Sequence, residues 1–185
     1  MEFLKTSIEG LVIIRPDVFG DERGYFFESY NSLKFKEAGL DLTFLQDNES
    51  KSKKGVVRGL HFQAPPFEQG KLVRVVRGAA LDVAVDIRQG SPTYGKWESV
   101  LLSGENKTLF WIPPGFAHGF VTLEDDTVFF YKCTNVYNKA AEGSIVWNDP
   151  DLAINWGVEN VLASEKDQAC PRFRDLVSPF TWSGD

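Results

Sequence analysis

The strongest constraint on the fold lies between residues 55 and 88, where three β-rich runs follow one another closely. In the third run, apolar residues occupy every second position: Leu81, Val83, Val85 and Ile87. This is the period-two pattern of a strand with one apolar face. Pro65 and Pro66 exclude a helix or an interior strand between the first two runs. The segment therefore predicts three successive strands, with His61 closing the first and Lys71 opening the second.

The rest of the chain repeats this strand-and-turn pattern. Further strands are expected over residues 11–15, 25–30, 44–49, 97–102, 108–112 and 127–134, and the stretch from Pro113 to Phe120 is expected to form a tight corner. Residues 19–24 read as a turn. A short helix is expected over 33–38, capped by Asn31 or Ser32, and a helical turn begins at Ser164. Short strands separated by Gly and Pro predict a mainly β sandwich or barrel in a single domain, residues 1–185.

Composition and charge exclude several classes of protein. The net charge is −6, without a basic cluster that would bind duplex nucleic acid. The N-terminus lacks the apolar core of a signal peptide, and no stretch approaches the ~20 apolar residues of a membrane span. Only two cysteines are present, Cys133 and Cys170, so neither a disulfide framework nor a structural zinc site is expected. These features predict a protein of the reducing cytoplasm.

A partial metal-binding motif occurs at Pro113-x-Gly115-x-x-His118, which matches the second half-motif of cupins. The first half-motif requires H-x-H, whereas this chain has His61-Phe62-Gln63. Because the whole chain contains two histidines, too few ligands remain for the usual cupin metal centre. We therefore expect no metal.

Polar residues concentrate in the three strands expected between residues 55 and 88. Arg58, Lys71, Asp82 and Asp86 accompany His61 there, and inward polar residues in a barrel of this size usually line a ligand cavity. Strict alternation places Arg58 and His61 on opposite faces of their strand. If both side chains reach one ligand, the strand must bulge near Gly59.

Two further candidates, Tyr131 and Asp167, have ordinary structural explanations. Tyr131 lies between Phe129 and Cys133 on one face of a strand, and this position favours a core tyrosine with a satisfied hydroxyl. Asp167 lies three residues after Ser164 and reads equally as part of a capping box. From the residues alone, the prediction ends at a polar-lined β-barrel.

Longer motifs add a resemblance. They are VRGLHFQ at 57–63, QGKLVRV at 69–75, DVAVDIR at 82–88, SPTYG at 91–95, WIPPGFAHGF at 111–120 and YKCT at 131–134. In order and spacing, from about residue 3 to about residue 172, the chain resembles the dTDP-4-dehydrorhamnose 3,5-epimerases, a metal-free branch of the cupins. The resemblance implies an antiparallel jelly-roll barrel with short peripheral helices, those at the C-terminus lying within 164–178.

The implied reaction is epimerisation at C3 and C5 of a dTDP-linked 4-keto-6-deoxyhexose, without a cofactor. The resemblance makes His61 the base, Tyr131 the acid that returns the proton, and Lys71 the cation beside the enolate oxygen. Asp167 would orient His61 and stabilise its imidazolium form. Asp82 is an alternative for that orienting role, and the sequence does not choose between the two.

The resemblance also implies a substrate-binding set and a homodimer. The binding positions are Arg23, Glu28, Gln46, Asn48, Arg58, His118, Tyr137, Glu142 and Lys166, with Phe19 or Phe26 stacking on thymine. N-terminal strands exchanged between subunits would let Arg23 and Glu28 serve the partner's site. Three alternatives remain open: an epimerase acting at C3 or C5 only, a non-catalytic sugar-nucleotide-binding module, and a metal-dependent cupin oxygenase.

Overall fold

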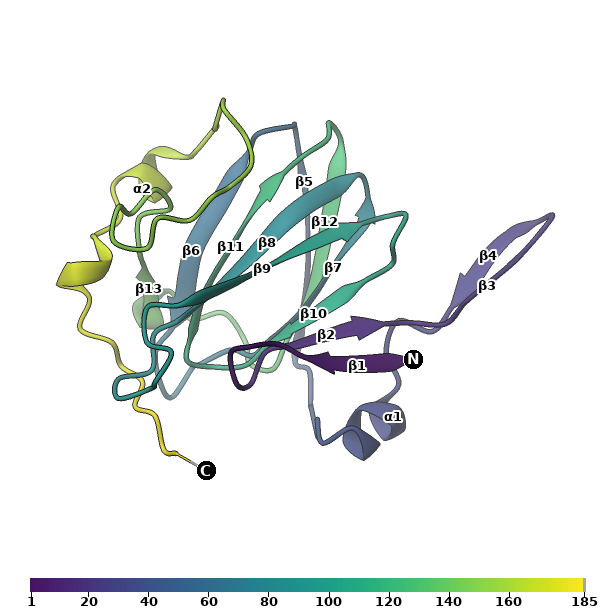
Figure 1. Cartoon of the computed structure of the whole chain (residues 1–185), viewed down its shortest axis with the longest axis horizontal. Coiled ribbons are helices and arrows are strands. Elements are labelled where there is room, and N and C mark those ends of the chain that lie inside the picture. Colours follow the sequence, from purple (N-terminus) through teal and green to yellow (C-terminus); the bar gives the residue numbers. More distant parts are fainter. Residues whose placement is uncertain (185) are drawn as a thin grey trace.

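The computed structural model describes residues 1–184, and its centre is a pair of antiparallel β-sheets that face each other (Figure 1). The six-stranded sheet has the order β1 (Glu2–Lys5), β2 (Val12–Arg15), β10 (Leu109–Ile112), β7 (Lys71–Arg77), β12 (Thr127–Cys133) and β5 (Gln46–Ser52). The five-stranded sheet has the order β13 (Glu142–Ser144), β6 (Val57–Gln63), β11 (Phe116–Thr122), β8 (Ala79–Asp86) and β9 (Trp97–Ser103). The predicted mainly β jelly-roll is confirmed.

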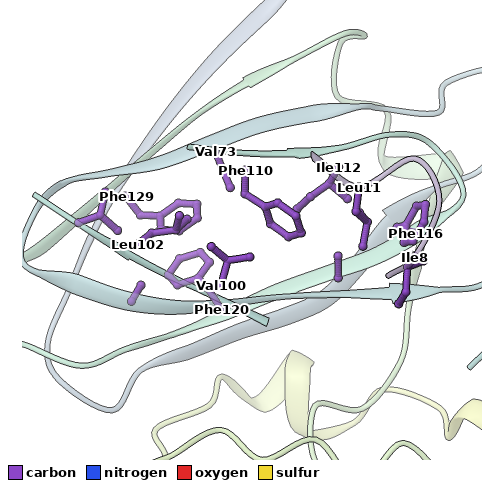
Figure 2. Close-up of a cluster of buried hydrophobic side chains, with 13 residues drawn as sticks. Ile8, Leu11, Val73, Val100, Leu102, Phe110, Ile112, Phe116, Phe120 and Phe129 are labelled. Atoms are coloured by element: carbon purple, nitrogen blue, oxygen red, sulfur yellow. The ribbon is translucent and has the colours of Figure 1, made fainter. Parts of the chain in front are cut away.

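The main core lies between the two sheets. Alternate residues of facing strands meet there, among them Val73, Val100, Phe110, Phe120 and Phe129 (Figure 2). The rings of Phe120 and Phe129 stack with centroids 3.9 Å apart, joining β11 of one sheet to β12 of the other. This apolar layer fills the barrel and leaves the space around His61 and Lys71 for polar side chains.

Each sheet also has a covered outer face. Helix α1 (Ser32–Glu37) packs Phe35 against Leu72 and Trp111 on the six-stranded sheet. The C-terminal region covers the five-stranded sheet and contains helix α2 (Glu165–Gln168) and a 3-10 turn over Phe173–Asp175. A second 3-10 turn, Lys139–Ala141, precedes β13. Among residues 1–184, no helix is long and apolar enough to cross a membrane.

One hairpin projects away from both sheets. Strands β3 (Val18–Asp21) and β4 (Gly24–Phe27) pair only with each other, and seven of their eight residues are exposed (Figure 1). Large aromatic side chains are among them: Phe19 is 66% exposed and Phe26 is 70% exposed. We call residues 18–27 the arm.

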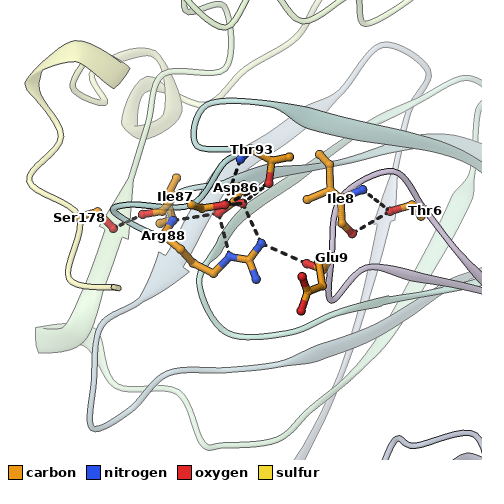
Figure 3. A network of polar contacts seen from close by, with 9 residues as sticks. Thr6, Ile8, Glu9, Asp86, Ile87, Arg88, Thr93 and Ser178 are labelled. Atoms are coloured by element: carbon orange, nitrogen blue, oxygen red, sulfur yellow. Dashed lines mark hydrogen bonds and ion pairs between the residues drawn. The ribbon is translucent and has the colours of Figure 1, made fainter. Parts of the chain in front are cut away.

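The C-terminal segment is fastened to the body by a polar network. Asp86 is buried and accepts hydrogen bonds from the guanidinium of Arg88 at 2.9 and 2.7 Å and from the hydroxyl of Ser91 at 2.6 Å (Figure 3). Ser178 donates to the carbonyl of Ile87, and the ring of Trp182 covers Arg88 at 4.4 Å. The expectation that Asp86 lines the ligand cavity is therefore wrong, because its carboxylate is fully used within this turn.

Several expected boundaries change. Residues 116–122 form β11, an interior strand between β6 and β8, so only Pro113 to Gly115 act as a corner. The turn expected at 19–24 is largely strand, and β5 extends to Ser52. The N-terminal strand β1 carried no clear signal. Both helix starts agree with expectation: Asn31 caps α1 and the Ser164 hydroxyl accepts a hydrogen bond from the Asp167 N–H at 3.1 Å.

Candidate active site

An irregularity in β6 brings Arg58 and His61 to the same side. His61 lies opposite His118 on β11, whereas Arg58 lies opposite Phe120, and the register shifts between these pairs. Gly59 lies between them with φ of +140°, and a Cβ atom there would be 2.5 Å from the Cα of Gly119. Only glycine fits this close approach. The bulge that the sequence required near Gly59 is therefore present.

A cavity of about 190 Å³ opens between the two sheets at this point. We call it the chamber, and its lining is Ser50, Arg58, His61, Lys71, His118, Phe120, Tyr131 and Asp167. A second hollow of about 290 Å³ shares His61, Lys71 and Tyr131 with the chamber and continues to the surface. We call this one the rim hollow. All four residues predicted for catalysis thus surround one space.

His61 forms a close pair with Asp167. Its Nε2 lies 2.6 Å from Asp167 Oδ1, and the Asp167 side chain is almost fully buried. An ionised carboxylate accepts the Nε2–H proton, which leaves Nδ1 with a free lone pair. Burial lowers the pKa of His61, and Asp167 partly offsets this effect. The imidazole is therefore neutral at pH 7 and able to accept a proton.

Asp82 belongs to a different pair. Its Oδ2 lies 2.8 Å from His118 Nε2, and both side chains are buried. The alternative that Asp82 orients His61 is therefore wrong, since Asp167 occupies that position. The two strands concerned, β8 and β11, are direct neighbours, so His118 and Asp82 are brought together within the five-stranded sheet.

Tyr131 and Lys71 come from the opposite sheet. Burial raises the pKa of Tyr131, so the phenol keeps its proton at neutral pH. Burial lowers the pKa of Lys71, while Cys133, Asp82 and Glu142 favour its charged form. His61 on one sheet and Tyr131 on the other thus face the same space from two sides.

Four of the nine predicted binding positions line the rim hollow, and a fifth, Lys166, pairs with one of them. Gln46 Oε1 accepts a hydrogen bond from the Tyr137 N–H at 2.8 Å, and Gln46 Nε2 donates to Asn48 at 3.0 Å. The Lys166 ammonium lies 2.6 Å from Glu142, which also accepts from the Tyr137 hydroxyl at 3.4 Å. These contacts form a polar wall on the side of the hollow that is open to solvent.

The predicted residues of the arm, and Glu28 directly after it, are not brought to this site within one chain. Phe19, Arg23 and Phe26 surround a separate hollow on the arm itself. Arg23 pairs with Asp21, and Glu28 lies 2.9 Å from Lys34. Their side chains therefore do not line the chamber or the rim hollow of their own chain.

Five lining residues were not predicted from the sequence: Ser50, Phe62, Gln63, Gln69 and Phe120. Ser50 continues the alternation of Gln46 and Asn48 along β5, so that pattern was sufficient to find it. Phe120 offered no signal, because it was assigned to a corner. Among residues 1–184, no group of three or more His, Cys, Asp or Glu side chains is arranged to hold a metal ion.

Comparison with known proteins gives one consistent family. A family model described as dTDP-4-dehydrorhamnose 3,5-epimerase matches residues 5–175. The Shigella flexneri enzyme of that name is 54% identical over 176 residues, covering 95% of this chain and 97% of the relative. The Salmonella typhimurium enzyme is 56% identical over 173 residues, covering 92% and 94%.

Solved structures agree in fold. A dTDP-6-deoxy-D-glucose-3,5-epimerase from Legionella pneumophila, solved with dTDP-4-keto-L-rhamnose, has a TM-score of 0.94 and 48% identity, covering 99% of each chain. A 3'-monoepimerase from Streptomyces bikiniensis, solved with dTDP-quinovose, has a TM-score of 0.85 and 38% identity, covering 90% of this chain and 85% of that one.

Proposed function

The chain belongs to the dTDP-4-dehydrorhamnose 3,5-epimerase family, and we propose that it inverts C3 and C5 of its sugar with His61 as base and Tyr131 as acid. Its function is that of a dTDP-4-dehydrorhamnose 3,5-epimerase in dTDP-rhamnose synthesis. The substrate is dTDP-4-dehydro-6-deoxy-D-glucose and the product is dTDP-4-dehydro-L-rhamnose. The chain is therefore an isomerase.

The chemistry depends on the C4 ketone. A hydrogen on C3 or C5 is α to this carbonyl and leaves as a proton when the resulting enolate is stabilised. We assign the stabilising charge to the Lys71 ammonium, which lines both the chamber and the rim hollow. His61 takes the proton, Asp167 stabilises the imidazolium, and no change in oxidation state occurs. The mechanism therefore requires no redox cofactor.

One observation supports this assignment most strongly. His61 belongs to β6 of the five-stranded sheet, whereas Tyr131 and Lys71 belong to β12 and β7 of the six-stranded sheet, and all three line the same chamber. A flat sugar enolate held between the sheets would meet a base on one face and an acid on the other. Inversion requires this two-sided access, since returning the proton to the original face regenerates the substrate.

We assign dTDP binding to the polar wall of the rim hollow. Tyr137 presents a half-exposed aromatic ring beside Gln46 and Asn48, and Lys166 adds a positive charge near Glu142. Arg58 supplies N–H donors within the chamber, which His118 also lines. Arginine and lysine at these places suit a diphosphate, which both groups bind through charge-assisted hydrogen bonds.

Isotope exchange tests the function directly. Incubation with dTDP-4-dehydro-6-deoxy-D-glucose in deuterated water should introduce deuterium at both C3 and C5. Label at one carbon only would show the single-site epimerase instead, an alternative raised by the similarity to the monoepimerase. Binding of dTDP without any exchange would contradict catalysis altogether. Matched incubation with His61→Ala measures the uncatalysed background.

We further propose a homodimer in which each arm serves the other subunit. The arm projects from the body, and its exposed Phe19 and Phe26 are unusual for a monomer surface. Arg23 and Glu28 do not reach the chamber of their own chain. Exchange of arms would bring Arg23 to the diphosphate and one of the two phenylalanines to the thymine in the partner's site.

Mixing two inactive variants tests the exchange. In a hybrid of Arg23→Ala and His61→Ala subunits, one site contains an intact His61 together with Arg23 of the partner subunit. Activity should therefore reappear on mixing, up to about a quarter of the wild-type value when subunits exchange at random. If Arg23 serves its own chain, every site in the hybrid lacks one group and activity stays absent. Sedimentation of the wild-type protein checks that a dimer forms.

We propose that the whole chain is a single domain and that it works in the cytoplasm. The two sheets share one core, and residues 145–180 pack onto the five-stranded sheet rather than forming a core of their own. Cys133 and Cys170 are both free thiols, as proteins of reducing compartments usually have. Limited proteolysis that released a stable fragment would contradict the single domain.

A further inference from the structure

Asp82 is a charged residue placed inside the apolar core. It lies on β8 between Ala80 and Ala84, and both alanines belong to the cluster between the two sheets. The Asp82 side chain has no exposed surface. Burying an ionised carboxylate is costly unless it is paired, so its presence there requires partners within the protein.

Only one of the two Asp82 oxygens has a partner. Oδ2 is bonded to His118 Nε2, whereas Oδ1 is buried and has no hydrogen-bond partner among residues 1–184. A carboxylate oxygen without a partner in a protein interior keeps its full electrostatic influence on nearby charges, because water does not screen it. His118, the partner of Asp82, lines the chamber together with Lys71, and the charges of Asp82 and Lys71 each favour the ionised form of the other.

Lys71 is surrounded by ionisable groups from the neighbouring strand β12, from three strands of the other sheet and from helix α2. These groups are Cys133 and Tyr131 on β12, Glu142 on β13, His61 and Arg58 on β6, His118 on β11 and Asp167 on α2. Apart from Asp82, the carboxylates among them are Glu142, which is paired with Lys166 at 2.6 Å, and Asp167, which is paired with His61 at 2.6 Å. Asp82 is therefore the carboxylate with unused capacity toward Lys71.

We propose that Asp82 is a positioning residue for the epimerisation, whose buried carboxylate keeps the Lys71 amine protonated and directed at the ketone oxygen. The proposal rests on the proposed role of Lys71 in stabilising the enolate. An uncharged lysine at that place would offer the enolate a weak hydrogen bond in place of a full positive charge. Asp82 thus acts on the substrate only through its neighbours.

The sign of the effect follows from the two groups together. Burial lowers the pKa of Lys71, and the charge of Asp82 opposes this decrease. Burial raises the pKa of Asp82, and the charges of His118 and Lys71 oppose this increase. If the Asp82 charge is removed, less remains to counteract the effect of burial on Lys71, so the pKa of Lys71 must fall further. The lysine then loses its charge at a lower pH than in the wild-type protein.

Titration of Lys71 by NMR tests this without reference to activity. The protein is labelled with 13C at the lysine ε carbon, and the Lys71 signal is identified by its loss in Lys71→Met. In Asp82→Asn, which keeps shape and removes charge, the midpoint should fall by roughly one pH unit. The matched control Glu142→Gln should lower it less, since Glu142 is shared with Lys166. An unchanged midpoint in Asp82→Asn would overturn the proposal.

A wild-type measurement covers the case in which Asp82→Asn does not fold. The 13Cγ signal of Asp82, identified in aspartate-labelled protein by comparison with Asp82→Glu, should be that of a carboxylate at pH 7. It should also shift across the pH range in which Lys71 titrates, since the two charges interact. A signal of the protonated acid at pH 7 would overturn the proposal, because a neutral Asp82 does not stabilise the positive charge of Lys71.

The dependence of kcat/KM on pH tests this proposal and the assigned role of Lys71 separately. In Asp82→Asn, kcat/KM at pH 7.5 should fall roughly tenfold, and its alkaline limb should move to lower pH together with the Lys71 midpoint. A shifted midpoint with an unshifted profile would support Asp82 as the partner of Lys71 and contradict the role of Lys71 in catalysis. Circular dichroism of each variant confirms that the fold is retained.

Discussion

The two histidines that line the chamber each pair with an aspartate, and the two pairs differ in access. His61 and His118 are direct cross-strand neighbours on β6 and β11, and each has Nε2 bonded to an aspartate oxygen, at 2.6 and 2.8 Å. The His61 side chain is 30% exposed, whereas that of His118 is 7% exposed. The same pair of groups thus occurs once with an open face and once enclosed.

The aspartates also reach the histidines by different routes. Asp82 lies on β8, which pairs with the strand that carries His118, so that pair is fixed within one sheet. Asp167 comes from the short helix α2, which packs against β6. The first arrangement holds a charge in a constant position, and the second leaves one side of the imidazole open to a ligand. Access, rather than the identity of the residues, separates a base from a fixed charge.

The largest effect is expected from His61→Ala. This change removes the open imidazole and should reduce deuterium exchange at both C3 and C5 by about 10⁴-fold, the upper range for general base catalysis. The measurement is mass spectrometry of the sugar nucleotide after incubation in deuterated water. If His118→Ala abolished exchange while His61→Ala retained it, the roles of the two pairs would have to be reversed.

Asp167→Asn should have the next largest effect. The amide does not stabilise the imidazolium or fix the ring proton on Nε2, so kcat should fall by about 10³-fold. Asp167 raises the pKa of His61 against the effect of burial, so its removal lowers that pKa further. The acidic limb of the pH profile of kcat/KM should therefore move to lower pH. Asp82→Asn differs, because it is expected to shift the alkaline limb of the same profile. An acidic limb that moves to higher pH would contradict the assigned pairing.

Tyr131→Phe should slow turnover by about 10²-fold and leave part of the proton abstraction intact. His61 still removes the proton in this variant, but the phenol that returns it from the opposite sheet is absent. Exchange of label into recovered substrate should then exceed formation of product. Equal losses of exchange and of product formation would show that Tyr131 is needed before the proton leaves.

The smallest effect on activity is expected far from both pairs, at Trp182. Its ring covers the Arg88 guanidinium at 4.4 Å, and Trp182→Ala should lower the free energy of unfolding by about 1 kcal/mol. Since Arg88 and Trp182 do not line the chamber, kcat/KM should stay unchanged. Urea denaturation and steady-state kinetics of the same preparation check both parts. A loss of activity without a loss of stability would connect the C-terminal segment to the site.

Much of the local structure was predictable because it depends on neighbouring residues. The alternation of apolar residues from Leu81 to Ile87 predicted β8, and the capping side chains Asn31 and Ser164 predicted where both helices begin. Strand β11 was not predictable in this way. Its Pro and Gly residues read as a corner, yet pairing with β6 on one side and β8 on the other holds residues 116–122 extended.

The residue pattern alone showed that polar residues interrupt an otherwise apolar β-barrel, and that Arg58 and His61 share a face only if β6 bulges near Gly59. It did not determine which aspartate serves which histidine. Asp167 is 106 residues from His61 along the chain, and Asp82 is 36 residues from His118. Contacts at such separations depend on how the strands and the helix pack, so the packing of the whole chain sets which pair is open and which is enclosed.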